Sequence, residues 1–163
     1  MPSIRASVQE KVMGNSQEKT LSKIVSESLE KLAFMFLLSD SFRDPIPFLN
    51  AVTAEVSFTG VFSGRLAVVM SEPALKELAA NMLGIDNEEV EQNHLEDALK
   101  ETANIICGNW LPVVGGDEAV FHIDAPRILS PSQAATALTG QSPSVLEKMS
   151  VDEEPCDVYF FRE

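Results

Sequence analysis

The stretch AVTAEVSFTGVFSGRLAVVM, residues 51–70, decides the fold class of this 163-residue chain. Residues 51–58 and 65–70 are short runs rich in β-branched and other apolar side chains, and the segment between them, TGVFSG, contains two glycines. This pattern is typical of two antiparallel strands joined by a turn. The sequence therefore predicts a β-hairpin over residues 51–70.

Helical patterns lie on both sides of the hairpin. Over residues 17–38 apolar side chains recur at steps of three and four, which predicts a long amphipathic helix. After the hairpin, Ser71 and Pro73 are suited to the first turn of a helix, and Gly84 is suited to its end. A shorter helix is therefore expected between the hairpin and Gly84.

The second half of the chain begins with an acidic connection at residues 86–91. A second long helix follows, and we expect it to end before Pro112, because proline disfavours helical geometry in the residue ahead of it. Residues 119–129 predict a strand, in which Pro126 indicates a bulge, an edge position or an early end. Residues 130–144 are rich in Ser, Thr, Pro and Gly and predict a loop.

The predicted elements repeat along the chain. With a final strand at residues 157–161, the order helix, strand, strand occurs over residues 17–70 and again over residues 93–161. The fold class that we predict is α+β, with an antiparallel sheet covered by two long helices and an internal duplication of the helix-strand-strand unit. The length fits one such domain over residues 17–163, preceded by a polar leader at residues 1–16.

The composition argues against several classes of function. The chain has 12 Lys and Arg against 25 Asp and Glu, a formal net charge of −13. Nucleic acids and anionic membranes bind clustered basic residues, so neither is an expected partner. The longest uninterrupted apolar run, residues 32–38, is far shorter than the ~20 residues that a membrane span needs. Residues 1–16 lack the apolar core of a secretory signal, so we expect a cytoplasmic protein.

Cysteine spacing predicts neither a metal site nor a disulfide. Cys107 and Cys156 lie far apart and form no Cys-x-x-Cys pair, so we expect ordinary reduced residues. His94, Asp97 and Glu101 could in principle meet a cation, but one histidine with two exposed carboxylates is a common surface set. We expect no metal site and no cofactor of the chain's own.

The candidate site lies on the second long helix. A projection at 100° per residue puts apolar side chains on one side and a polar stripe on the other, made of His94, Asp97, Glu101, Asn104 and Gly108. Like charges four residues apart slightly destabilise a helix, so Asp97 and Glu101 do not serve local stability. Gly108 also weakens a helix interior and could admit either a partner's backbone or another helix. A plain solvated helix face is the alternative explanation of the stripe.

Several segments of the sequence resemble one family. Residues 101–109, ETANIICGN, resemble the E-x-x-N helix of the CheC/CheX-type chemotaxis phosphatases, and Asp97 extends the match to the D/S-x-x-x-E-x-x-N form. The hairpin segment 58–69, the segment LAANMLG at 78–84 and the segment IDAPRI at 123–128 are similar to neighbouring parts of the same family.

The resemblance implies an activity, a partner and roles for two residues of the stripe. Members of this family remove the phosphate from the phosphoaspartate of a CheY-like response-regulator receiver. By motif position, Asn104 would orient the attacking water and Glu101 would contact the receiver's lysine. The receiver would hold the Mg²⁺. We also expect Asp97, Gly108 and His94, which lie on the same stripe, to bind the partner. The family also implies a homodimer.

A non-catalytic role is the alternative. A CheC/CheX-like binding module in chemotaxis, in the flagellar switch or in two-component signalling would use the same scaffold to dock a partner. The contact would then run through the sheet edge or the polar stripe, and Asn104 would be a contact residue only.

The first long helix repeats the motif spacing without its asparagine. Ser26, Glu30 and Ala33 have the spacing of Asp97, Glu101 and Asn104, and we expect them on the face opposite the apolar residues. One active stripe per chain is therefore expected, as in the single-motif CheX branch. A simpler interpretation is that Ala33 favours helix formation and Glu30 is solvated.

Overall fold

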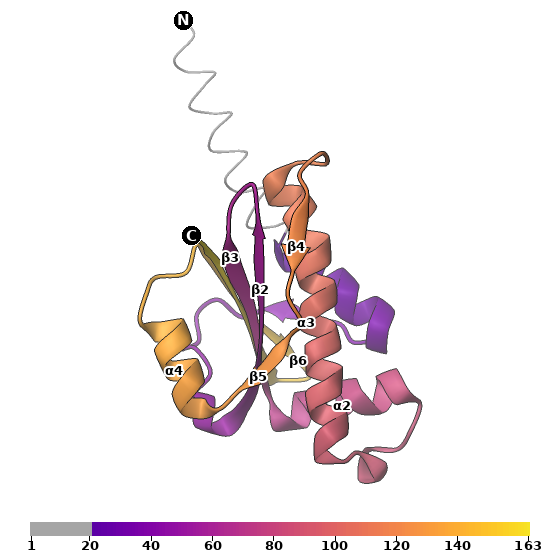
Figure 1. Ribbon diagram of the computed structural model, residues 1–163. Coiled ribbons are helices and arrows are strands. Elements are labelled where there is room, and N and C mark those ends of the chain that lie inside the picture. Colours follow the sequence, from indigo (N-terminus) through magenta and orange to yellow (C-terminus); the bar gives the residue numbers. More distant parts are fainter. Residues whose placement is uncertain (1–20) are drawn as a thin grey trace, which may run out of the picture.

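The predicted hairpin forms one half of a larger antiparallel sheet. The computed structural model describes residues 21–163, and in it β2 (Ala51–Gly60) pairs antiparallel with β3 (Gly64–Ser71). β6 (Val145–Val151) and β7 (Glu154–Arg162) form a second hairpin. β3 and β7 pair with each other and join the two hairpins (Figure 1). The predicted α+β class with an antiparallel sheet is confirmed.

Short strands complete the sheet at its two edges. β1 (Leu38–Ser39) pairs with β6, whereas β4 (Phe121–Ile123) and β5 (Arg127–Leu129) both pair with β2. The strand predicted over residues 119–129 is therefore split in two, with Pro126 in the interruption. An edge strand tolerates this proline because its missing N–H can face away from the sheet.

The two halves of the chain have the same order of elements. Each half contains a long helix, an edge strand and a hairpin, and each edge strand pairs with the first hairpin strand of the other half. This order agrees with an internal duplication, but residues 119–129 correspond to β1 and not to a hairpin strand. The true counterpart is β6, which has no clear strand pattern in the sequence because it mixes apolar residues with Glu147 and Lys148.

The first helix ends earlier than predicted. It ends at Ala33, although the apolar pattern continues to residue 38. Phe34 has a positive φ of 54°, which interrupts helical geometry, and the apolar residues after it lead into edge strand β1. Residues 17–20 of the predicted helix and the polar leader at residues 1–16 lie outside the described residues.

The predicted short helix is present with both expected ends. α2 (Glu72–Leu83) begins after Ser71, whose Oγ accepts a hydrogen bond from the Ala74 amide. It ends at Gly84, which has a positive φ of 67° that a residue without a Cβ adopts at no steric cost. The capping residues in the sequence were therefore sufficient to predict both ends of α2.

The second long helix does not end before Pro112. α3 (Gln92–Gly115) continues through Pro112 for another turn. The carbonyl that loses its hydrogen-bond donor belongs to Gly108, which is exposed and can be hydrated. Trp110 and Leu111 are buried, so their packing holds this part of the chain in helical geometry against the local preference.

The predicted loop at residues 130–144 contains a helix. α4 (Pro131–Thr139) begins with a capping box, in which the Gln133 amide donates to Ser130 Oγ and the Ser130 amide donates to the Gln133 side chain. The serine and proline that suggested a loop are the start signals of this helix, and its alanines favour the helical state.

The helices lie on both faces of the sheet. The first helix (described over residues 21–33), α2 and α3 cover one face and share the main core with it (Figure 1). α4 and the short helix η1 (Phe48–Asn50) cover part of the other face, over a smaller core. α3 is therefore a surface helix, and its outer side points away from the sheet.

The motif-like spacing of the first helix does not form an exposed stripe. Ala33 is fully buried in the main core, and its carbonyl accepts a hydrogen bond from Asn81 Nδ2 at 2.8 Å. Glu30 is exposed, as expected. The predicted exposure of Ala33 is wrong because Ala33 continues the four-residue series of Val25 and Leu29, which faces the sheet.

We predict that Ala33→Asn destabilises the protein and creates no second motif. A larger polar side chain would have to enter a filled apolar site, so the free energy of unfolding should fall by about 2–4 kcal/mol. Urea denaturation followed by circular dichroism measures this change. Glu30→Gln, an exposed substitution on the same helix, is the matched control and should change stability by less than ~0.5 kcal/mol. An Ala33→Asn variant as stable as the control would contradict the buried position.

Candidate functional site

His94 helps to start α3. The Glu91 amide donates a hydrogen bond to Nδ1 of His94 at 3.0 Å across the first turn of the helix. Because Nδ1 accepts this bond, the proton of the neutral ring is on Nε2. The sequence pattern predicts partner binding for His94, whereas the structure gives its Nδ1 a capping role. Contact with a partner through Nε2 stays a prediction.

The structure places the rest of the polar stripe on the outer side of α3. Asp97, Glu101, Asn104 and Gly108 are exposed, whereas the residues on the opposite side are buried: Leu95, Leu99, Thr102, Ala103, Ile106 and Trp110. Glu101 and Asn104 are three residues apart, so their side chains extend from neighbouring positions on one face. Within residues 21–163 neither side chain has a hydrogen-bond or ion-pair partner, so both are available to another molecule.

A groove lies on one side of the stripe, between the end of α2 and the start of α3. It has a volume of about 260 Å³. Met82 and Leu83 form its apolar wall, and His94, Asp97 and Glu101 form its polar wall. Such a groove suits a long side chain with an apolar stem and a charged end.

Another groove lies on the other side of the stripe, between the first helix and α3. It has a volume of about 340 Å³, and Ile105 and Asn109 of α3 face Lys31 and Leu32 of the first helix across it. The exposed positions of α3 therefore form a ridge between two grooves. A ridge of this kind can enter a cleft in a partner protein.

Gly108 leaves open space on this ridge. A Cβ built at this position would meet no atom within 4 Å. Close packing of another described helix therefore does not explain the glycine, and this alternative is wrong. Close approach of a partner's backbone stays a prediction.

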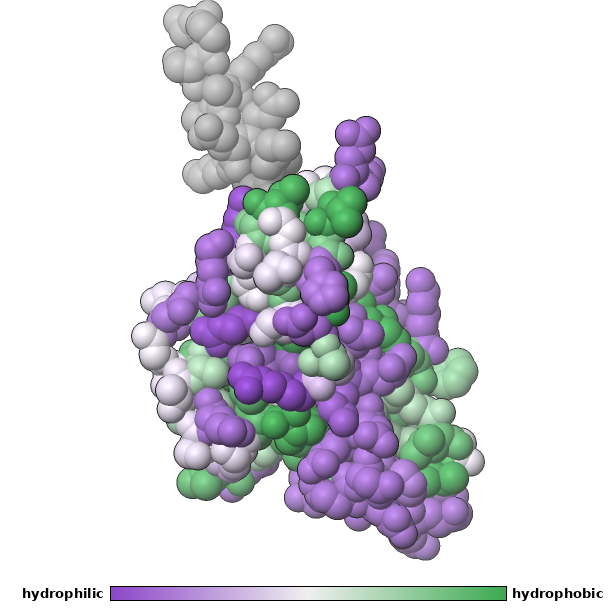
Figure 2. Space-filling view, viewed as in Figure 1, coloured by the Kyte–Doolittle hydropathy of each residue, from purple (hydrophilic) through white to green (hydrophobic). Residues whose placement is uncertain are grey.

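Negative charge gathers around the start of α3. Residues 86–101 include seven acidic residues and one basic residue, a net charge of −6. The basic residue, Lys100, lies 3.5 Å from Asp97 in an exposed pair that contributes little stability. The short helix η2 (Asn87–Glu89) is exposed, and hydrophilic residues cover the lower end of the molecule in Figure 2, beside apolar patches. This end of the molecule therefore favours a basic partner surface.

The side chains of the stripe are suited to positioning the reacting groups of a partner. Burial raises the pKa of both thiols, Cys107 and Cys156, to about 12, so neither is a nucleophile near neutral pH. Within residues 21–163 no group of His, Cys, Asp and Glu side chains could hold a metal ion. The exposed carboxylate and carboxamide can instead orient groups that a partner brings.

Over the same described part of the chain, no helix has both the length and the apolar character that crossing a membrane requires.

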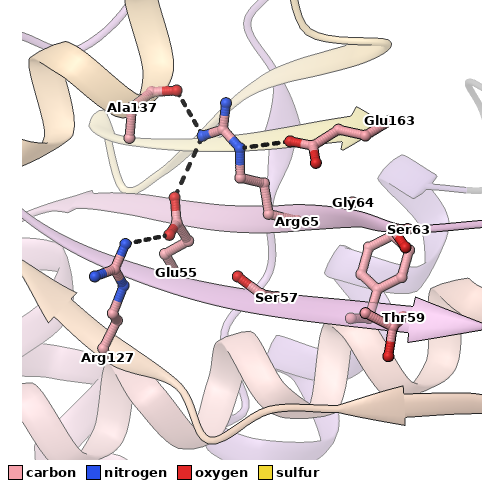
Figure 3. Close-up of a pocket in the computed structure, with 10 residues that line it drawn as sticks. Glu55, Ser57, Thr59, Ser63, Gly64, Arg65, Arg127, Ala137 and Glu163 are labelled. Atoms are coloured by element: carbon pink, nitrogen blue, oxygen red, sulfur yellow. Dashed lines mark hydrogen bonds and ion pairs between the residues drawn. The ribbon is translucent and has the colours of Figure 1, made fainter.

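A polar cluster on the other face of the sheet has no signal in the sequence. Glu55 is only 3% exposed and accepts hydrogen bonds from Arg127 at 2.9 Å and from Arg65 at 3.3 Å (Figure 3). Arg65 also donates to the Ala137 carbonyl of α4 and to Glu163. The two arginines balance the charges of the two glutamates. Their hydrogen bonds connect α4 and edge strand β5 to the central strands β2 and β3. We interpret this cluster as structural, because strand pairing brings its residues together and its bonds hold neighbouring elements in place.

Comparison with known proteins gives one family match. The model of the family described as chemotaxis phosphatase CheX matches residues 52–149, which include the hairpin, α2 and the polar stripe. None of the curated proteins compared with this chain matches it significantly.

Solved structures share the fold. A chain of the CheX–CheY–BeF3–Mg²⁺ complex from Borrelia burgdorferi has a TM-score of 0.70 at 16% identity, covering 89% of this chain and 96% of that one. Chemotaxis protein CheX from Vibrio vulnificus has a TM-score of 0.68 at 16% identity, covering 88% and 93%. FliY from Thermotoga maritima has a TM-score of 0.55 at 14% identity, covering 90% and 89%. At these identities the likeness shows the fold alone.

We predict that the buried thiols make the protein less stable in alkali. An unfolded cysteine titrates near pH ~8.5, whereas the folded pKa of Cys107 and Cys156 is about 12. The folded state therefore binds more protons between these values, and the free energy of unfolding should fall as the pH rises above ~8.5.

Urea denaturation at about pH 7.5 and about pH 10 measures this loss, and Cys107→Ala serves as the comparison. The variant removes one of the two titrating thiols, so it should lose less stability than the wild type over the same interval. An equal loss in both proteins would contradict the role of Cys107.

Proposed function

The chain belongs to the CheX family of chemotaxis phosphatases, and on this premise we propose that it hydrolyses the aspartyl phosphate of a CheY-like receiver domain. The observation that carries the proposal is the pair Glu101 and Asn104, exposed about one turn apart on the ridge of α3 and without a partner among the described residues. The shared fold with a chain of the CheX–CheY complex supports a receiver as the partner.

Asn104 has the chemistry needed to orient a water molecule. Its carboxamide offers both an acceptor oxygen and a donor N–H, so it can hold water in line with the phosphorus of a docked receiver. The water oxygen forms a bond to phosphorus, and the bond from phosphorus to the aspartate oxygen breaks. The aspartate leaves as a carboxylate beside inorganic phosphate. An acyl phosphate is already activated, so positioning supplies the acceleration and no strong base is required.

Glu101 would align the two proteins. Its carboxylate lies on the same face, next to the groove between α2 and α3, and can accept a charge-assisted hydrogen bond from the receiver's lysine. In this scheme the receiver supplies the phosphoaspartate and the Mg²⁺. Asp97 lies one turn before Glu101 and adds negative charge toward the same basic surface.

We propose a homodimer as well, as the family resemblance implies. Within the described residues β1 is the outer strand on its side of the sheet, and Phe34, Phe36 and Leu38 are exposed in and before it. Two copies of one sheet edge can pair antiparallel about a two-fold axis. Such pairing would cover this apolar surface.

We predict that Asn104→Ala slows receiver dephosphorylation and largely preserves binding. The variant removes the water-orienting group, and misplacement of the reacting water should cost about 100-fold in rate. Phosphate release from a phosphorylated receiver with Mg²⁺ measures the rate, and titration of the receiver measures binding.

Asn109→Ala is the matched control, because Asn109 is an exposed asparagine on the same helix but outside the stripe. It should keep the wild-type rate. If wild-type protein accelerates dephosphorylation of no receiver from the same cell, the phosphatase proposal is wrong and the non-catalytic binding module remains.

We predict that the acidic connection speeds encounter with the receiver. Glu88→Lys with Glu89→Lys should lower the association rate several-fold at low salt and flatten its salt dependence, because long-range attraction to a basic surface is lost. Stopped-flow mixing at several salt concentrations measures this. Asp117→Lys with Glu118→Lys makes the same charge change just beyond the other end of α3 and should have a smaller effect. Equal effects of the two pairs would leave net charge, and not its location, as the cause.

A further inference from the structure

A cavity of about 550 Å³, widely open to solvent, lies on the face of the sheet opposite α3. Ile46 and Phe48 form one wall, and Leu138 at the end of α4 forms the other. Leu146 of β6 and Tyr159 of β7 also line it, from the sheet. In Figure 1, α4 lies on the other side of the sheet from α3, so this cavity and the ridge of α3 are on opposite faces. The volume is within the usual range of small-molecule sites, roughly 300–1,000 Å³.

The walls of the cavity have restricted backbones. Pro45, Pro47 and Pro143 all line it, and each proline fixes its own φ. Ile46, between two of them, is buried, and its amide donates to the buried carboxylate of Asp157 at 2.8 Å. The cavity therefore exists before any ligand enters, which lowers the entropic cost of binding.

Tyr159 contributes a hydroxyl to this cavity from the sheet. The residue is only 4% exposed, and within residues 21–163 its hydroxyl has no hydrogen-bond partner. Burial raises the pKa of Tyr159, and the nearby Asp157 raises it further, so the phenol keeps its proton. Among the described residues the Tyr159 oxygen is not one of the buried atoms without a partner, so it contacts solvent, and a ligand acceptor would replace water there.

The residues that line the cavity favour an uncharged ligand. Of the twelve described residues that line the cavity, none is charged, although 23% of the whole chain is. A charged ligand would lose hydration without gaining an ion pair. An apolar ligand gains from contact with Ile46, Phe48, Leu138 and Leu146.

We propose that this cavity binds an uncharged, mainly apolar small molecule that carries one carbonyl-type acceptor for the Tyr159 hydroxyl. The site is separate from the phosphatase proposal, because it shares no residue with the ridge of α3 or with either groove beside it. A ligand could therefore occupy it while a partner contacts α3.

Nile red is a suitable probe, because it is uncharged, aromatic and carries a ring carbonyl. We expect saturable binding of one Nile red per chain, measured by its fluorescence increase. Tyr159→Phe removes only the hydroxyl and should weaken binding about fivefold, the effect of one hydrogen bond of ~1 kcal/mol. 1-Anilinonaphthalene-8-sulfonate, an apolar dye with a negative charge, should bind at least about tenfold more weakly.

Leu146→Lys tests the location of the site, because it puts a charge at a half-buried position on the cavity wall. It should reduce Nile red affinity more than about tenfold. Leu83→Lys is the matched control: this exposed leucine lies on α2 outside the cavity, and its substitution should leave affinity unchanged. Urea denaturation checks that both variants fold.

The proposal is overturned by absence of saturable Nile red binding, or by affinity that Tyr159→Phe leaves unchanged. If Leu146→Lys does not fold, Tyr159→Phe alone decides, since it keeps the shape of the side chain. Tighter binding of the anionic dye than of Nile red would also contradict the uncharged ligand class.

Discussion

The pairing of β3 with β7 is the interaction on which the rest of the structure depends. It joins the two hairpins, and most residues of both strands are buried. Val68 and Phe160 point to the main core, whereas Val69 and Tyr159 point to the smaller one. An isolated two-stranded hairpin is at best marginally stable, so neither half could support its helices alone. Joined, the hairpins give the long helices one apolar face and α4 the other.

Packing of Trp110 against the sheet determines how α3 is oriented at the candidate site. Its ring packs edge to face against Phe160 of β7, with centroids 5.8 Å apart, and it is almost completely buried. A large side chain held in this way sets the rotation of α3 about its own axis. Glu101 and Asn104 are exposed because Trp110 is buried, and a rotation that hid Asn104 would bring Trp110 to the surface. The sheet thus determines which side of the helix a partner can meet.

Elements with strong local signals could be predicted from the sequence. The hairpin at residues 51–70 has two segments rich in apolar and β-branched residues around two glycines, and α2 has a serine cap and a closing glycine at Gly84. Predictions failed where distant contacts oppose the local pattern. Packing of Trp110 carries α3 past Pro112, and β6 forms because it pairs with β7 on one side and with β1 on the other. The prediction of a loop in place of α4 failed for a different reason, since the residues of its capping box can be read directly from the sequence.

The sequence by itself determined which residues of α3 share a face, because the 3.6-residue period of a helix converts spacing directly into direction. It also determined the family resemblance, which rests on the residues around Glu101 and Asn104. Only the tertiary structure decided that this face is a ridge between two grooves, that Ala33 is buried, and that the Tyr159 hydroxyl faces an uncharged cavity. These features depend on contacts between residues far apart in the chain, and no spacing along the sequence specifies such contacts.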